Sequence, residues 1–171
     1  MVIRQENKND FEKIFQFIKT AFETAEVKDG DEQDFVNELR SSKHYIPELA
    51  FVAELDGEII GYIMMTKTYV EHETKKIEVL YLAPLAVSIE YRNKKVGSLL
   101  IETALKKAHD MGFKAVFLAG NPAYYNRFGF VASIRHSIKC SLEVPEELYE
   151  NIMVYELYPQ ALNGIMGIVK F

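Results

Sequence analysis

The fold is decided by one stretch of sequence, Leu85-Ala86-Val87-Ser88-Ile89-Glu90-Tyr91-Arg92-Asn93-Lys94-Lys95-Val96-Gly97-Ser98, which joins an apolar strand to the start of a helix. The apolar side of that helix predicts its course, through Val96, Leu100, Ala104, Ala108 and Met111. The first amides of a helix have no partner within it and together carry about half a positive charge. With Arg92, Lys94 and Lys95 nearby, they favour a bound diphosphate; the alternative is a solvated basic turn before an ordinary helix.

The segments on either side of this helix predict a pair of parallel strands. One strand is expected over Lys75–Val87, and Pro84, which cannot donate a ladder hydrogen bond, predicts that pairing ends near it. Gly112 is the expected C-cap of the helix, and a short buried strand follows over residues 114–119. A strand, helix and strand in this order form a βαβ unit with a right-handed crossover, so the two strands should be parallel.

The remaining elements are predicted from hydrophobic period and turn residues. A helix is expected to start from a cap at Asn9 or Asp10, and Asp56-Gly57 is a favoured hairpin turn between two strands. The strands are expected over residues 1–5, 51–55, 58–69, 130–134, 152–157 and 165–169, and further helices over residues 31–40 and 122–128. No repeat or linker interrupts this order, so a single domain over residues 1–171 is expected.

The composition is that of a soluble globular protein. Of the 171 residues, 49% are hydrophobic and 26% are charged, enough for one substantial core. The net charge of -5 argues against nucleic acid or an anionic membrane as a partner. No apolar run is long enough to cross a bilayer and the first residues lack a secretory signal, so a cytoplasmic location is expected. Cys140 is the only cysteine and the four histidines are scattered, so no disulfide and no metal site are expected.

The basic segment resembles the cofactor motif of the GCN5-related N-acetyltransferases (GNAT), in which Arg or Gln is followed after two residues by Gly and then, one residue further, by Gly or Ala. Arg92, Lys95 and Gly97 take these places, with Lys95 where the family prefers glycine. The resemblance implies that the diphosphate of acetyl-coenzyme A (acetyl-CoA) is bound by Arg92, Asn93, Lys94, Lys95, Val96, Gly97 and Ser98. Lys95 leaves two outcomes open: a different backbone turn, since glycine alone adopts left-handed angles at little cost, or a helical backbone that brings the ammonium to the diphosphate.

Two further segments carry the same resemblance. Leu85-Ala86-Val87 matches the family's Leu-x-Val stretch, which implies that Leu85, Ala86 and Val87 bind the pantetheine arm of the cofactor as an added strand would. The run Asn121-Pro122-Ala123-Tyr124-Tyr125-Asn126-Arg127-Phe128-Gly129-Phe130 is similar to the family's last helix and Gly-Phe turn, most closely in a subgroup of predicted bacterial acetyltransferases. The implied fold is α/β (mixed α+β), with a central, mostly antiparallel sheet that splays at its middle strands and is flanked by helices.

The reaction implied by the resemblance is transfer of an acetyl group from acetyl-CoA to a primary amine, by direct attack in a ternary complex. Tyr125 is then the acid that protonates the departing thiolate, and Asn121 contacts the pantetheine or the thiolate; the alternatives are core packing for Tyr125 and a turn role for Asn121. Some family members carry a base, a strand glutamate, where this sequence has Tyr81. Glu78 is interpreted as an exposed strand carboxylate, so deprotonation through ordered water is expected.

Only one feature of the composition bears on the acceptor amine, the acidic segment over residues 23–38. Such a segment attracts a cationic amine, although acids at a helix start are also ordinary. Two functions stay open: a working acetyltransferase for a small-molecule or peptide amine, and a CoA-binding or regulatory domain with weak or no turnover. A different acyl donor is a third alternative, and the resemblance also implies that the chain can form a homodimer.

Overall fold

The computed structural model describes residues 1–24 and 30–171, and the contacts among these residues divide them into two compact units. Unit 1 comprises Met1–Thr66 and Ala83–Lys107, and unit 2 comprises Lys67–Leu82 and Ala108–Phe171. A single domain over the whole chain stays a prediction. No helix among the described residues is long and apolar enough to cross a bilayer.

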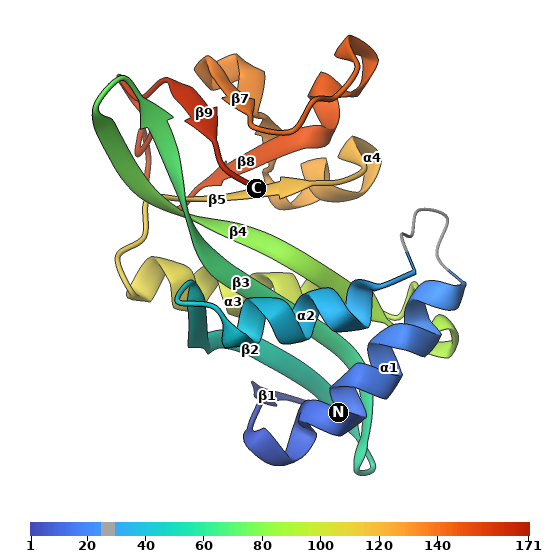
Figure 1. Cartoon of the computed structure of the whole chain (residues 1–171). Helices are drawn as coiled ribbons and strands as arrows, with labels where there is room; N and C mark the ends of the chain where they lie inside the picture. The colour runs from blue at the N-terminus through green and yellow to red at the C-terminus, as the bar shows by residue number, and fades with distance from the viewer. Residues whose placement is uncertain (25–29) are drawn as a thin grey trace. The chain divides into compact units, whose positions relative to one another are not determined.

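The helices and strands follow the order expected from the sequence (Figure 1). The strands are β1 (Val2–Gln5), β2 (Tyr45–Leu55), β3 (Glu58–His72), β4 (Lys75–Val87), β5 (Ala115–Ala119), β6 (Val131–Ala132), β7 (Ile138–Cys140), β8 (Ile152–Glu156) and β9 (Gly167–Val169). The α-helices are α1 (Phe11–Glu23), α2 (Glu32–Ser41), α3 (Val96–Asp110) and α4 (Pro122–Tyr125). The 3-10 helices are η1 (Lys8–Asp10), η2 (Ile89–Tyr91), η3 (Asn126–Phe128), η4 (Ser133–His136) and η5 (Glu146–Asn151).

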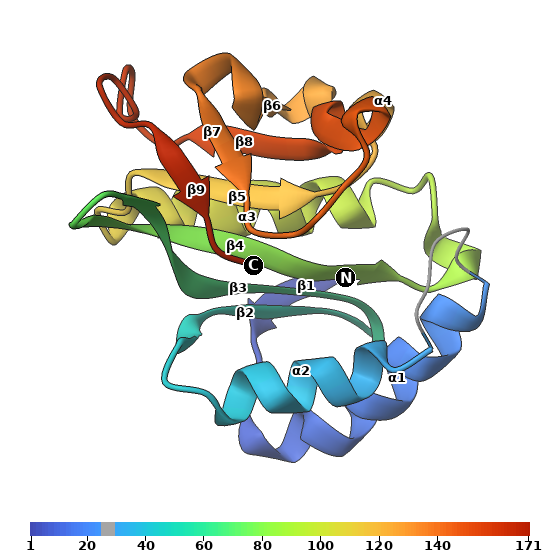
Figure 2. The same cartoon turned by 45° about the horizontal axis from the view of Figure 1, so that its top comes forward.

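Unit 1 is built on three antiparallel strands, β1, β2 and the first part of β3. The β2–β3 hairpin turns at Asp56-Gly57, as the sequence predicts, because both residues take positive φ. Helices α1 and α2 lie together on one face of these strands (Figure 2). Alternate strand residues pack with them in one core, which contains Ile14, Ile18, Val36, Ala50, Val52, Tyr62 and Met64.

Helix α3 packs on the other face of the unit 1 strands. Gly61, next to Tyr62 on β3, points away from the α1–α2 core, because successive strand residues face opposite sides. A Cβ at Gly61 would lie 2.9 Å from Leu100 Cδ1 and 2.9 Å from Val96 Cγ1. The glycine therefore allows the first turns of α3 to approach the strand closely.

Unit 2 is built on β5, which pairs in parallel with β4 and in antiparallel with β8. Strand β6 pairs with β8, and β9 lies between the last part of β3 and β7. The core of this unit contains Val70, Val79, Ala115, Phe117, Ile138, Val154, Leu162 and Val169. The sheet is thus mixed and mostly antiparallel, with helices flanking it, as the resemblance implies.

The parallel pair predicted around α3 is confirmed. Leu80 of β4 pairs with Val116 of β5, and Tyr81 pairs with Phe117. In the part of the chain that the structure describes, this register does not continue toward Val87, so the pairing of β4 with β5 ends near Pro84, as the sequence predicts. Gly112 ends the helix with φ of +84°, and its amide donates to the His109 carbonyl.

Two local predictions differ in part from the structure. Asp10 is the N-cap residue of α1, as expected, but its side chain makes no capping hydrogen bond there. Asn7 caps η1 one turn earlier, and Asp10 completes that capping box by accepting from the Asn7 amide. The strand expected over residues 130–134 ends at Ala132, because η4 begins at Ser133, whose hydroxyl donates to the Ile138 carbonyl (2.8 Å). Strand β7 was not expected from the sequence.

Candidate functional site

The basic stretch of unit 1 forms a tight turn that leads directly into α3. Asn93 has φ of +62° and Lys95 has φ of +65°, so both residues adopt left-handed backbone. The Lys95 carbonyl accepts a hydrogen bond from the Leu99 amide (3.0 Å), which places the first free amides of the helix at Val96 and the residues after it. The turn therefore keeps a left-handed conformation at the position where the family prefers glycine.

The side chains around this turn give it a positive and accessible surface. Asn93, Lys94 and Lys95 are exposed, whereas Val96 and Gly97 are buried and Ser98 is half-buried. The ammonium of Lys94 lies 5.2 Å from the centre of the Tyr91 ring. Free amides at a helix N-terminus, with exposed ammonium groups next to them, fit the chemistry of a diphosphate.

Arg92 has a different environment from the two lysines. Its guanidinium donates to the carbonyls of Ala21 (2.9 Å) and Thr24 (3.2 Å) and to the Thr24 hydroxyl (3.0 Å). Its Nε also donates to the Val87 carbonyl (3.3 Å). A cation on the last carbonyls of α1 complements the negative end of the helix, so the side chain joins the turn to α1.

The three residues matched to the pantetheine stretch end strand β4. Leu85 and Val87 are half-buried and alternate with buried Pro84 and Ala86. The chain then turns away, since the Ser88 amide donates to the Ile60 carbonyl (3.0 Å) and η2 begins at Ile89. The stretch is thus a strand end immediately before the basic turn.

In unit 2, Asn121 has the turn role that the sequence left open as its alternative. Its side chain accepts from the Ala123 amide (2.9 Å) and caps α4, and Pro122 occupies the first position of that helix. Its carbonyl accepts from the amides of Tyr124 (3.0 Å) and Tyr125 (3.1 Å). These contacts fix the orientation of α4 and of the two tyrosines on it.

Tyr125 is half-buried and packed by its neighbours in unit 2. Its ring lies edge-on to Tyr124, with 4.9 Å between the ring centres, and 5.7 Å from the ring of Phe130. A Cβ at Gly120 would lie only 2.5 Å from Tyr125 Cε2, so this glycine makes room for the ring. Burial, together with the charges of Tyr124 and Tyr81 when ionised, raises the pKa of Tyr125 well above its usual value, so the hydroxyl stays protonated. Sequence reasoning missed the contact between Gly120 and Tyr125. The only sign of it in the sequence is a small residue just before Asn121.

The two residues considered for a base are in different environments. Tyr81 is half-buried and stacks on Phe171 with 4.4 Å between ring centres, and burial raises its pKa, so the hydroxyl stays protonated and is not available to accept a proton. Glu78 is exposed, as the sequence predicts, and pairs with Lys67 (3.1 Å). Tyr81 therefore has no free place for a proton, and the Glu78 carboxylate is engaged by Lys67.

The remaining predictions concern the acidic segment and metals. Residues 25–29 of that segment lie outside the described residues. Glu32 and Asp34 lie in the first turn of α2. Acidic residues are common at a helix start, so this position favours the ordinary explanation of the acidic segment over an amine-binding role. Among residues 1–24 and 30–171, no group of His, Cys, Asp or Glu is arranged to hold a metal ion.

Known proteins resemble the chain in sequence and in fold. A model of the acetyltransferase (GNAT) family matches residues 11–130. The uncharacterized N-acetyltransferase YhbS of Escherichia coli K12 is 32% identical over 173 residues, which cover 100% of this chain and 96% of YhbS. The 1.55 Å crystal structure of E. coli YhbS in complex with CoA has a TM-score of 0.87 at 30% identity and covers 99% of this chain and 88% of that one.

A second solved structure shares the fold at lower identity. It is a GNAT acetyltransferase from Brucella melitensis in complex with acetyl-CoA, with a TM-score of 0.79 and 24% identity, covering 99% of this chain and 94% of that one. The family uses acetyl-CoA as its cosubstrate. Because the family model spans most of the sequence and YhbS matches along its whole length, the chain belongs to the GNAT family of acetyltransferases.

Proposed function

We propose that the chain is an acetyl-CoA-dependent N-acetyltransferase that acetylates a primary amine. The observation that carries the proposal is the turn before α3, which has the left-handed backbone at Lys95 even though the residue is not glycine. Free helix amides and the exposed ammonium groups of Lys94 and Lys95 support diphosphate binding by residues 92–98. Leu85, Ala86 and Val87 are proposed to contact the pantetheine arm.

Cofactor binding is tested first, because it requires no knowledge of the acceptor. Acetyl-CoA, CoA and dephospho-CoA are each added to the purified protein and thermal unfolding is measured. A ligand present at about a hundred times its dissociation constant adds roughly 2.7 kcal/mol of apparent stability. For a protein of this size we expect Tm to rise by roughly 5 to 10 °C. No shift with millimolar acetyl-CoA would contradict the proposal.

The chemistry needs four events. The neutral amine nitrogen attacks the thioester carbonyl carbon, the bond from that carbon to sulfur breaks, and the amine loses a proton to water. The departing thiolate must then be protonated or hydrogen-bonded. We propose Tyr125 as the acid for this role: burial raises the pKa of its hydroxyl, so the hydroxyl stays protonated and donates a hydrogen bond to the thiolate, and water replaces the proton if the thiolate takes it up.

The role of Tyr125 is tested by Tyr125→Phe, with Tyr124→Phe as the matched control on the same helix. Loss of a proton donor in the transition state should lower kcat about a hundredfold and leave KM for acetyl-CoA within about twofold. Because the pKa of Tyr125 is raised, the wild-type kcat should also show no decline near pH 10. Equal kcat in Tyr125→Phe and the wild type would exclude the role.

The second candidate is a domain that binds CoA without efficient turnover. Tyr81 at the place of the family's strand glutamate is the observation that favours it, because its raised pKa keeps the hydroxyl protonated and unable to accept the amine's proton. A panel of amines with acetyl-CoA, with release of free thiol as readout, separates the two. Binding of acetyl-CoA without thiol release for any amine between pH 6 and pH 10 would favour this second candidate.

A further inference from the structure

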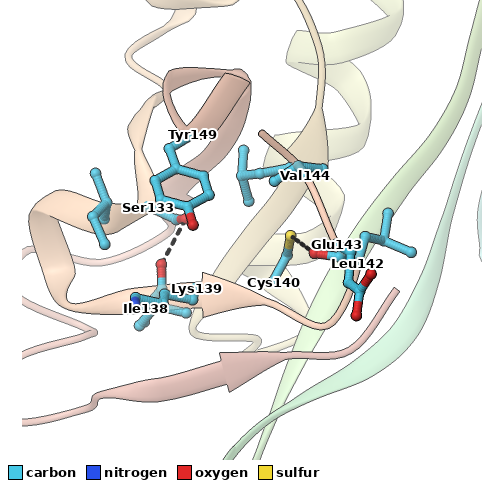
Figure 3. Close-up of a pocket in the computed structure, with 10 residues that line it drawn as sticks. Ser133, Ile138, Lys139, Cys140, Leu142, Glu143, Val144 and Tyr149 are labelled. Carbon is cyan, nitrogen blue, oxygen red and sulfur yellow. Dashed lines mark hydrogen bonds between the residues drawn. The ribbon is translucent and has the colours of Figure 1, made fainter. Parts of the chain in front are cut away.

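Unit 2 contains a cavity of about 290 Å³ (Figure 3). It opens to solvent and is lined by residues of η4, β7, the segment over residues 141–144 that follows β7, and Tyr149 of η5. The side chains that form most of its wall are Ile134, Ile138, Cys140, Leu142, Val144 and Tyr149. The proposed acetyl transfer assigns no role to any of these residues.

Hydrogen bonds hold the walls of this cavity in place. The Ser133 hydroxyl donates to the Ile138 carbonyl (2.8 Å), which ties η4 to β7 (Figure 3). The Cys140 thiol donates to the Leu142 carbonyl (3.4 Å), which closes the turn after β7. The Ser141 amide donates to the Val169 carbonyl (2.9 Å), so this turn is also fixed to β9. The cavity is therefore preformed, which is the usual condition of a ligand site.

The lining determines which chemistry the cavity can accept. The Ser133 and Cys140 side chains in its lining already donate to carbonyls, Tyr149 adds a phenol hydroxyl, and the other uncharged lining residues are aliphatic. Lys139 and Glu143 are exposed residues of opposite charge, so the lining carries no net charge that favours a ligand of one sign. A charged ligand would find only these exposed partners, and an exposed ion pair contributes little binding energy.

The volume of the cavity limits the size of the ligand. An apolar cavity of about 150 Å³ is enough to bind benzene. We propose that the unit 2 cavity is a binding site for a compact, uncharged apolar group of one or two rings, or a branched chain of equal volume. Ile134 and Leu142 are 38% and 48% exposed at the cavity, and a ligand of this kind would cover part of that apolar surface.

Cys140 provides the readout, because it is the only cysteine of the chain and lines the cavity. The full chain, without acetyl-CoA, is alkylated with iodoacetamide in the presence of indole, 2-naphthol or cyclohexanol at millimolar concentration. A probe at ten times its dissociation constant should slow alkylation of Cys140 about tenfold by mass action. If none of the three slows alkylation in the wild type, the proposal is overturned.

Two variants show whether the protection arises in the cavity. Val144→Phe places a ring in the cavity, and protection by the probes should fall below about twofold. The matched control Ile168→Phe changes an exposed residue of β9 and should keep full protection. Circular dichroism confirms that each variant is folded, and ligand-observed NMR reports probe binding in the wild type even if a variant does not fold. Full protection in folded Val144→Phe would overturn the proposal, since the probes would then bind elsewhere.

A final experiment shows whether the apolar group belongs to the acceptor amine or to a separate ligand. Tryptamine carries the same ring system as indole together with a primary amine. Acetylation of tryptamine that Val144→Phe abolishes would assign the cavity to the apolar part of the acceptor. Protection by indole without such acetylation would assign it to a separate ligand. Protection of Cys140 by the probes is measured without acetyl transfer and is the same in both cases. Failure of the cavity proposal can therefore be distinguished from failure of the proposed acetyltransferase function.

Discussion

Lys95 has a left-handed backbone that residues with a side chain rarely adopt. A residue with a side chain at φ of +65° carries a steric penalty of about 1 kcal/mol or more that glycine does not. Lys95→Gly should therefore raise the free energy of unfolding by up to about 1 kcal/mol in urea. The variant should also bind acetyl-CoA more weakly at low salt, because it loses an ammonium next to the proposed diphosphate site.

Lys94→Gly is the matched control for this prediction. It removes the same charge from the same turn, but Lys94 has no left-handed backbone to relieve. The control should lose stability, because glycine adds freedom to the unfolded chain. A Lys95→Gly protein no more stable than Lys94→Gly would show that the turn is not strained.

Gly120 determines the position of the Tyr125 ring. Its φ lies outside the left-handed region, so alanine is compatible with the backbone, but the added Cβ would lie 2.5 Å from Tyr125 Cε2. Gly120→Ala should destabilise the protein by about 1 to 3 kcal/mol in urea, because the ring must move. In a Tyr125→Ala background the same change should cost less than about 0.5 kcal/mol, since the ring is absent. Equal costs in both backgrounds would contradict the contact.

At the scale of elements, Arg92 connects the turn before α3 to the end of α1. Arg92→Met keeps the aliphatic stem and removes charge-assisted hydrogen bonds to Ala21 and Thr24, so the protein without ligand should lose about 1 to 2 kcal/mol in urea. Arg127→Met is the control, because Arg127 lies exposed over the Tyr124 ring. Unchanged stability of Arg92→Met, together with a smaller Tm shift by CoA, would instead assign the guanidinium to the diphosphate.

The order of elements could be predicted because hydrophobic period and turn residues act locally. The sequence predicts β4 over Lys75–Val87 and α3 from Val96, and both bounds are confirmed. Strand β7 could not be predicted in this way. It spans three residues, Ile138–Cys140, which are too few for a period of two, and it exists because it pairs with β9, nearly thirty residues further along.

At the scale of the whole molecule, the sequence predicts which segments form the candidate site but not how their side chains lie. Arg92 is a cation in the expected turn, yet its guanidinium contacts Ala21 and Thr24, and such long-range contacts leave no local pattern. Lys95 has a left-handed backbone, which lysine rarely adopts, so the residue type alone argues against this conformation. The family resemblance supplied what local patterns lack, while the roles of Tyr125 and Asn121 stay predictions.

Stability against acid is a property of the whole molecule, and the buried carboxylate of Asp10 contributes to it. Asp10 is buried and accepts hydrogen bonds from Arg4 (2.7 and 2.9 Å), and this guanidinium holds the pKa of Asp10 below its usual 3.8. A lowered pKa in the folded state contributes stability that is present above about pH 4 and is lost as the pH falls through the folded value.

Asp10→Asn should accordingly be less stable than the wild type by about 1 to 2 kcal/mol at pH 6, measured by urea unfolding. The difference should shrink at pH 3 and below, because the wild-type carboxyl then takes up a proton and weakens its bonds to Arg4. Glu48→Gln removes an exposed carboxylate of the same charge and should follow the wild-type profile. A difference between Asp10→Asn and the wild type that stays constant from pH 6 to pH 2 would mean that the Arg4–Asp10 pair makes no pH-dependent contribution. Acid unfolding would then have to be traced to other carboxylates.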